Sequence, residues 1–239
     1  MANVITSMKG RFHRDLVANP LTHGWVLNLY RSGERYPQRV CDYFQSDFAP
    51  TQELAVLLRQ HSADEDKHVL LFSQALKTLK QPVIEADLGD VFNEVVRSFT
   101  PGTFHIQESD SPEVRRRKLA NFLAHAHHLE KRVAQSFAYH MDACERSGKN
   151  TIASLVSRTK TDEDRHVSYT RETVFDLLTR KEAQTVMDLH RRAEAKANLK
   201  FSQRQVRKFL AQFGDITPKH RRWLYQICAT VMEAAGNYV

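Results

Sequence analysis

The chain has 239 residues, of which 41% are hydrophobic and 26% charged, with a formal net charge of +7, a composition typical of a globular protein. Its 8 glycines and 7 prolines favour long helices, and its three widely spaced cysteines form neither a CxxC metal motif nor a disulfide framework. No segment approaches the roughly 18 apolar residues of a membrane span, and the first ten residues lack a signal-peptide core. We therefore expect a cytoplasmic protein without a membrane span.

Hydrophobic spacing, capping residues and helix breakers predict a series of helices after an N-terminal segment of residues 1–20. The expected helices cover residues 21–48, 51–81, 85–99, 112–146, 151–180, 182–197 and 203–213, and a last one begins near Pro218. The class is thus all-α.

Four of these helices are long, and each carries apolar residues at alternating steps of three and four, the pattern of a helix-bundle seam. Near its middle, each seam is interrupted by acidic or imidazole side chains: Glu34, Glu65 with His68, Glu130, and Glu163 with His166. A carboxylate buried without a partner is very costly. We therefore expect these side chains to share a positive partner, for which a pair of metal ions is suited.

Two segments are near copies of each other: Asp-Glu-Asp-Lys-His-Val at 64–69 and Asp-Glu-Asp-Arg-His-Val at 162–167. Each holds Glu-x-x-His, which places both side chains on one helix face. Glu34 lies 31 residues before Glu65, and Glu130 lies 33 before Glu163, so antiparallel hairpins would bring all six to one level. The two halves look like a duplicated hairpin.

With this motif set the sequence resembles the ferritin-like superfamily of di-iron carboxylate proteins. The resemblance covers roughly residues 20–180. It implies a ferritin-like four-helix bundle at 21–180 with an extra crossover helix, and leaves a basic helical extension at 181–239 packed on the bundle. It also implies two iron ions, or one manganese and one iron. Glu34 and Glu130 would then be terminal ligands and Glu65 and Glu163 bridging ligands, with His68 and His166 serving one ion each.

The same resemblance gives a role to the aspartate before each motif glutamate. In several relatives this position holds the ligand histidine of the opposite motif by its second ring nitrogen. We therefore expect Asp64 to pair with His166 and Asp162 with His68. The second motif is also similar to that of soluble acyl-carrier desaturases, but this chain is much shorter than those enzymes.

One turn before the motif glutamates lie His61 and Thr159, both on the seams. His61 is interpreted either as an extra ligand or proton donor, or as a hydrogen-bonded core histidine. Thr159 is interpreted either as a hydroxyl that assists oxygen chemistry, or as a core threonine bonded to its own helix backbone. We list both as candidate catalytic residues.

Carboxylates combined with imidazole favour iron or manganese. The first hypothesis is a non-haem oxidase or oxygenase that uses O2 on an organic substrate, with an external reductase because no GxGxxG motif is present. The alternatives are a ferroxidase or rubrerythrin-like peroxide scavenger, and a DNA-associated ferritin relative. The chain lacks the paired CxxC motifs of a rubredoxin iron.

Residues 181–239 hold eleven Lys or Arg but only five Asp or Glu. This excess suggests a phosphate-bearing substrate, a nucleic acid, or an acyl or aminoacyl carrier; a solvated surface or a homodimer contact is the alternative. The candidate binding residues are Arg204, Arg207, Lys208, Arg221 and Arg222. In the last helix, a stripe of Leu224, Ile227, Val231 and Ala234 is expected to face the bundle.

Overall fold

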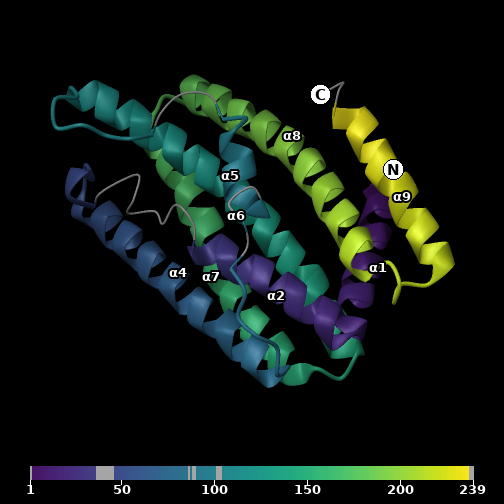
Figure 1. The fold of residues 1–239 in the computed structure, drawn as a ribbon. Coiled ribbons are helices and arrows are strands. Elements are labelled where there is room, and N and C mark those ends of the chain that lie inside the picture. The colour runs from purple at the N-terminus through teal and green to yellow at the C-terminus, as the bar shows by residue number, and fades with distance from the viewer. Residues whose placement is uncertain (1, 36–45, 86, 88–89, 101–103, 237–239) are drawn as a thin grey trace.

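The computed structural model describes residues 2–35, 46–85, 87, 90–100 and 104–236. Over these ranges the regular secondary structure is entirely helical, which confirms the all-α class. The elements in chain order are α1 (Ala2–Ala18), α2 (Pro20–Arg35), η1 (Ser46–Phe48), α4 (Gln52–Thr78), α5 (Phe92–Arg97), α6 (Pro112–Arg146), α7 (Asn150–Leu177), α8 (Arg180–Phe213) and α9 (Lys219–Gly236) (Figure 1).

The long helices α2, α4, α6 and α7 pack lengthwise around a shared interior (Figure 1). α2 lies along α4, α7 folds back along α6, and α4 contacts α7. Two apolar cores fill this interior, one around Leu58, Leu123 and Val174 and the other around Phe72 and Phe137. In α4 the stretch from His61 to His68 separates the two cores, so its polar side chains are enclosed by apolar layers at both ends of the bundle.

Local signals in the sequence set several helix ends. Thr51 caps α4 by accepting a hydrogen bond from the Leu54 backbone amide, 3.2 Å away. α6 begins at Pro112 after the capping residue Ser111 and ends at Arg146, as predicted. Gly148 then turns the chain with a φ of 68°, a conformation that favours glycine.

Other helix boundaries differ from those predicted. The two helices expected at 182–197 and 203–213 are one continuous helix, α8, because the stretch between them contains no glycine or proline to end it. The helix expected over 85–99 is limited to α5, Phe92–Arg97. Before α5 the chain is held by tertiary contacts instead, since the Asn28 side chain bonds the Pro82 carbonyl and the Ile84 amide. Of the helix expected over 21–48, the structure describes α2 up to Arg35 and the separate 3-10 helix η1 at Ser46–Phe48, and residues 36–45 lie outside the described ranges.

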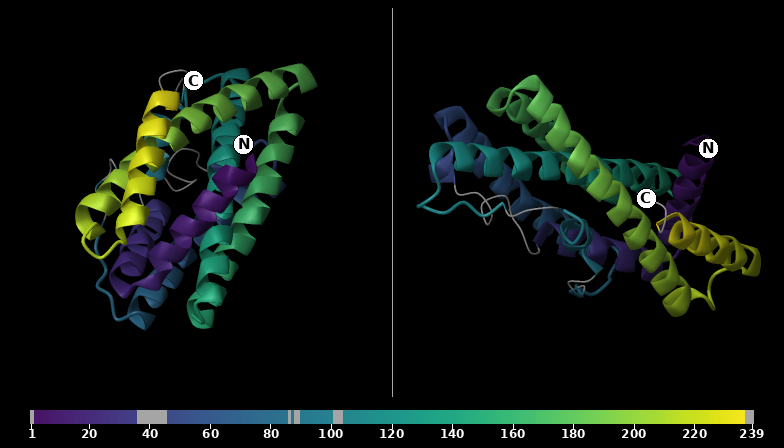
Figure 2. Two further views of the ribbon diagram at one scale, coloured as in Figure 1. Left: turned by 90° about the vertical axis from the view of Figure 1, so that its right-hand side faces the viewer. Right: turned by 90° about the horizontal axis from the view of Figure 1, so that it is seen from above.

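The N-terminal segment forms a 17-residue helix, α1, that packs on α2 and α6. α8 runs from α7 across α6 towards α1, and α9 folds back beside it (Figure 2). Leu16 of α1, Val26 of α2, Phe209 of α8 and Tyr225 of α9 form a further apolar cluster. This cluster joins the C-terminal helices to the start of the chain.

The predicted inward stripe of α9 is wrong. Ile227 and Val231 are 39% and 60% exposed, whereas Tyr225 and Ala229 are buried. The buried face is chosen by Tyr225, whose ring lies edge-on to Phe12 at 5.1 Å and whose hydroxyl bonds Asp15. A helix with apolar residues on two faces buries the face that also satisfies a polar partner.

None of the described helices combines the length and apolar composition that crossing a bilayer requires.

Candidate metal centre

The structure brings the six predicted ligands to one level of the four long helices. Glu34 lies in the last turn of α2, Glu65 and His68 in the middle of α4, Glu130 in α6, and Glu163 and His166 in α7. All six are at most 9% exposed, and His68, Glu163 and His166 are fully buried. Acidic side chains buried this deeply need a compensating charge.

The first group of candidate ligands surrounds His68. Its Nδ1 lies 3.3 Å from Glu34 Oε2 and 3.3 Å from Glu163 Oε1. Ligand atoms of Glu34, Glu65, His68 and Glu163 all lie within 4.8 Å of one another. Two ligands about 2.0–2.2 Å from one ion, at a right angle to each other, are about 3 Å apart. These four residues could therefore hold one ion.

A second group surrounds His166. Its Nδ1 lies 3.4 Å from Glu163 Oε2 and 3.8 Å from Glu65 Oε1, and Glu65 Oε1 lies 3.2 Å from His61 Nε2. His61, Glu65 and His166 meet the same 4.8 Å criterion. Glu163 thus presents one oxygen to each ligand histidine, the geometry of a carboxylate between two ions. Glu130 Oε1 lies 3.7 Å from His61 Nε2.

The crossed pairing expected between the two motifs is present. His68 Nε2 lies 3.2 Å from Asp162 Oδ2, and His166 Nε2 lies 3.4 Å from Asp64 Oδ2. In both histidines Nδ1 therefore faces the glutamates and Nε2 faces an aspartate. This arrangement fixes the ring orientation and leaves the Nδ1 lone pair directed at the centre.

Two basic residues that the sequence analysis missed hold these aspartates. Lys67 Nζ lies 2.9 Å from Asp64 and 2.5 Å from Asp162, and Arg165 lies 2.6 Å and 3.0 Å from the same two residues. Although burial raises it, the pKa of Asp64 is held below its ordinary value by Lys67 and Arg165. The available signal was the basic residue at the same position of both motif copies.

Three of the four glutamates have a raised pKa. Burial raises the pKa of Glu34 to about 8, and burial together with the Glu34 charge raises that of Glu65 to about 8. Burial and the neighbouring carboxylates also raise the pKa of Glu163 well above its ordinary value. In Glu130 the effect of burial is overcome by contacts with His61, which lower its pKa to about 2. Four carboxyl groups this close cannot all ionise without added positive charge.

Unpaired polar atoms provide a test of whether ions fit. Glu65 Oε1, Glu163 Oε1 and His61 Nε2 are buried, and although each lies within 3.3 Å of an ionisable neighbour, none makes a hydrogen bond of suitable geometry among the described residues. All three point into the two groups of candidate ligands. Metal coordination would satisfy each of these atoms, so the residues present fit a pair of metal ions.

The two candidate catalytic residues have different surroundings. His61 Nδ1 and the Tyr169 hydroxyl form a 2.6 Å hydrogen bond, and the His61 ring stacks on His166 at 3.5 Å. His61 is therefore hydrogen-bonded in the core and also turned towards the centre. Thr159 is fully buried, and its hydroxyl has no partner in the described structure. The interpretation that Thr159 bonds its own helix backbone is wrong.

The predicted basic residues lie on α8 and α9. Three of them pair with acidic residues of this chain: Arg207 with Glu233, Lys208 with Asp90, and Arg221 with Asp15 at 3.8 Å. Arg204 and Arg222 lie on the same two helices. The α8–α9 corner reaches α2 at Val26, eight residues and about 12 Å along the helix from Glu34.

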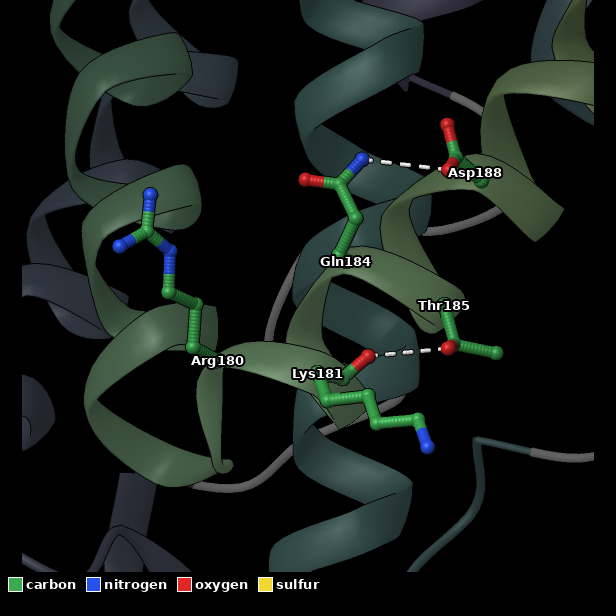
Figure 3. A pocket seen from close by; sticks show the side chains of 5 residues that line it. All are labelled: Arg180, Lys181, Gln184, Thr185 and Asp188. Carbon is green, nitrogen blue, oxygen red and sulfur yellow. Dashed lines mark hydrogen bonds between the residues drawn. The ribbon is translucent and has the colours of Figure 1, made fainter.

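Two surface hollows lie away from the ligands. One is lined by Ser73, Gln74, Lys77 and Thr78 of α4. The other lies at the start of α8, where Gln184 donates to Asp188 at 3.1 Å and Thr185 donates to the Lys181 carbonyl at 2.9 Å (Figure 3). The residues that line the second hollow all belong to the start of α8, and none of them is a candidate ligand.

No protein-family model matches the chain, and neither a curated protein nor a solved structure matches it significantly.

Proposed function

We propose that the chain is a ferritin-like di-metal carboxylate protein. The observation that carries this proposal is the presence of two adjacent groups of buried ligand atoms, one formed by Glu34, Glu65, His68 and Glu163 and the other by His61, Glu65 and His166. Glu130 belongs to neither group, and its Oε1 lies 3.7 Å from His61 Nε2. Crossed aspartates turn the same nitrogen of both histidines inward. A ligand set rich in carboxylate with one or two imidazoles per ion favours iron or manganese over zinc or copper. Glu34, Glu65, His68, Glu130, Glu163 and His166 would hold the ions.

The reaction class that this centre suits is oxidation or hydroxylation of an organic substrate by O2. Bound iron would supply the redox chemistry with O2, and electrons would come from an external reductase. Two apolar cores enclose the centre and would exclude bulk water from it. The Tyr169–His61 pair could hold a proton at Nδ1 or at the tyrosine hydroxyl, beside Glu65. The unpartnered Thr159 hydroxyl, one turn before Glu163, could bind a polar atom of substrate or oxygen.

The basic residues of α8 and α9 support an anionic substrate or carrier. Because Arg207, Lys208 and Arg221 already pair with acidic side chains, an incoming phosphate would have to replace those partners. Because the contacts to a phosphate would be ionic, its binding to these basic residues of α8 and α9 would weaken steeply as salt rises.

Metal stoichiometry and O2 consumption test the proposal. The metal-free protein should take up two Fe2+ per chain under anaerobic conditions. Glu163→Gln should lower this stoichiometry, because it removes the carboxylate that faces both histidines. Glu172→Gln, the same exchange at an exposed position of α7, is the control and should bind iron as the wild type does.

The fate of the iron distinguishes the reaction classes. An oxidase or oxygenase should consume O2 repeatedly when a reductant and substrate are supplied, with two irons retained per chain. O2 consumption that stops once the supplied Fe2+ is oxidised, with Fe3+ accumulating beyond two per chain, would instead identify iron handling. Failure to bind more than one ion per chain would contradict the di-metal proposal itself.

A further inference from the structure

A second cluster of metal-binding side chains lies in the interior, apart from the carboxylate centre. It consists of His23 on α2 with His140 and Cys144 on α6, and all three are fully buried. His140 and Cys144 are four residues apart and share one helix face. His23 precedes Glu34 by eleven residues, about 16 Å along α2, and His140 follows Glu130 by ten, about 15 Å along α6. We call these three residues the His–Cys cluster.

An aromatic layer separates the two sites. Tyr30, Phe72 and Phe137 pack on one another with ring centroids 5.0–5.6 Å apart. The Tyr30 ring also lies 5.3 Å from that of His140. The His–Cys cluster therefore shares no ligand with the carboxylate centre and can be tested independently of it.

The distances within the His–Cys cluster are those of atoms around one ion. Nε2 of His23 and Nε2 of His140 form a 3.0 Å hydrogen bond, and Cys144 Sγ lies 3.7 Å from His23 Nε2. An ion held by both Nε2 atoms would replace this hydrogen bond and leave the ring protons on Nδ1. An ion would lie about 2.0–2.1 Å from each nitrogen and about 2.3 Å from sulfur. For bond angles between a right angle and a trigonal one, the two nitrogens would then be about 2.9–3.6 Å apart, and nitrogen and sulfur about 3.1–3.8 Å apart. Both observed distances fall within these ranges.

Several buried polar atoms around the cluster also lack hydrogen-bond partners among the described residues. Nδ1 of His23, Nδ1 of His140, Nδ1 of the adjacent His13 and the Tyr30 hydroxyl are buried without hydrogen-bond partners in the part of the chain that the structure describes. Such a concentration of unpaired polar atoms in an interior calls for an ion or ordered water. Because Nδ1 and Nε2 point away from opposite sides of each ring, the Nδ1 atoms would be met by ordered water and not by an ion bound at Nε2.

The histidines are in the protonation state that metal binding requires, whereas the thiol must first lose its proton. Burial, assisted by the positive charge of Lys149, lowers the pKa of His23 to about 3, so the ring is neutral and has a lone pair to donate. Burial raises the pKa of the Cys144 thiol to about 12. An incoming ion would displace the thiol proton, and the resulting thiolate would offset the nearby ammonium.

We propose that His23, His140 and Cys144 bind one thiophilic metal ion, Zn2+ by preference, as a clamp that joins α2 to α6. Two imidazoles and a thiolate favour zinc over the iron or manganese suited to the carboxylate centre. The chain would then bind two kinds of ion at separate sites that differ in ligand type. The thiophilic ion would hold α2 and α6, the helices that carry Glu34 and Glu130, against each other.

Cobalt(II) is the probe, because thiolate coordination gives it a charge-transfer absorption that carboxylate and imidazole ligands do not. Cys41 and Cys228 are first replaced by serine, so that Cys144 is the sole thiol. Titrating the metal-free protein with Co2+ should produce this absorption, saturating at one ion per chain. Adding Zn2+ should abolish it by displacement.

Three variants in this background separate the two sites. Glu163→Gln alters only the carboxylate centre and should keep the absorption. Cys144→Ser should lose it. His23→Gln retains the thiol and should shift the cobalt titration to higher concentration. Cobalt uptake without thiolate absorption, in protein whose circular dichroism shows it folded, would overturn the proposal and leave a water-filled cluster as the explanation.

Discussion

At the scale of single residues, the decisive feature is the aspartate that precedes each motif glutamate. Asp162 faces His68 and Asp64 faces His166, so each copy of the motif orients the histidine of the other. Lys67 and Arg165 each contact both aspartates. Nδ1 of each histidine is thus turned inward by an aspartate that lies outside the two groups of candidate ligands.

Asp162→Ala should lower the affinity for Fe2+ by roughly 10–100-fold, because His68 loses the partner that orients its ring. Metal competition against a chromophoric chelator measures the change. Asp164→Ala is the matched control, since Asp164 is 58% exposed and pairs with Lys160 on the surface. Equal affinities in the two variants would show that the aspartate does not position the histidine.

The residue scale is also where the sequence was most informative. The repeat in the two motifs identified the four motif glutamates and histidines, and the seams of the other two long helices added Glu34 and Glu130. The crossed aspartates were expected from the resemblance to di-iron carboxylate proteins. It did not predict that His61 would stack on His166 or that the Thr159 hydroxyl would lack a partner. Those features depend on rotamers set by neighbouring helices, which helical spacing alone does not specify.

At the scale of helices, prediction succeeded where a cap or a breaker marks the end, as at Thr51 and Gly148. It failed for the orientation of α9, whose apolar residues occupy more than one face. The buried face is the one that carries Tyr225 and Ala229, and partners distant in sequence select it. Hydrophobic spacing identifies a helix reliably but does not choose between two apolar faces.

Two arginine substitutions test the orientation of α9. Ala229 is 2% exposed, and Ala229→Arg should lower the free energy of unfolding by about 2 kcal/mol or more, because it forces a charge against α8 and α1. Val231 is 60% exposed, and Val231→Arg should change the free energy of unfolding by no more than about 0.5 kcal/mol. Denaturant unfolding measures both. A larger loss of stability in Val231→Arg than in Ala229→Arg would instead support the inward stripe predicted from the sequence.

At the scale of the whole molecule, buried histidines should govern the response to acid. Burial lowers the pKa of His23 and His125 to about 3 and that of His190 to about 4. The ordinary value in an unfolded chain is about 6.5. Between these values the unfolded state binds more protons than the folded state, so the free energy of unfolding falls as pH falls.

Glu34, Glu65 and Glu163 oppose this effect in the metal-free protein, because their raised pKa values make the folded state bind more protons over the same range. The buried histidines with lowered pKa outnumber them, so stability should fall from about pH 6.5 downward, by up to about 1.4 kcal/mol per pH unit for each histidine before this opposing contribution. Denaturant unfolding at about pH 7, 6 and 5 measures the slope. His190→Gln, which keeps a polar group near Asn121, should reduce this slope of stability against pH. His220→Gln, at an exposed position, is the control and should leave the slope unchanged. A flat profile over this range would contradict the prediction.

The crossed aspartate–histidine pairs also have a consequence for symmetry. When two halves are related by a twofold axis, a contact between position i of the first half and position j of the second is matched by a contact between position j of the first and position i of the second. Asp64 with His166 and Asp162 with His68 obey this relation, so a pseudo-twofold axis passes between the two motifs. His61 and Thr159 occupy equivalent positions and break it. The two groups of candidate ligands are therefore chemically unequal, because only the one at His166 includes a third imidazole, that of His61.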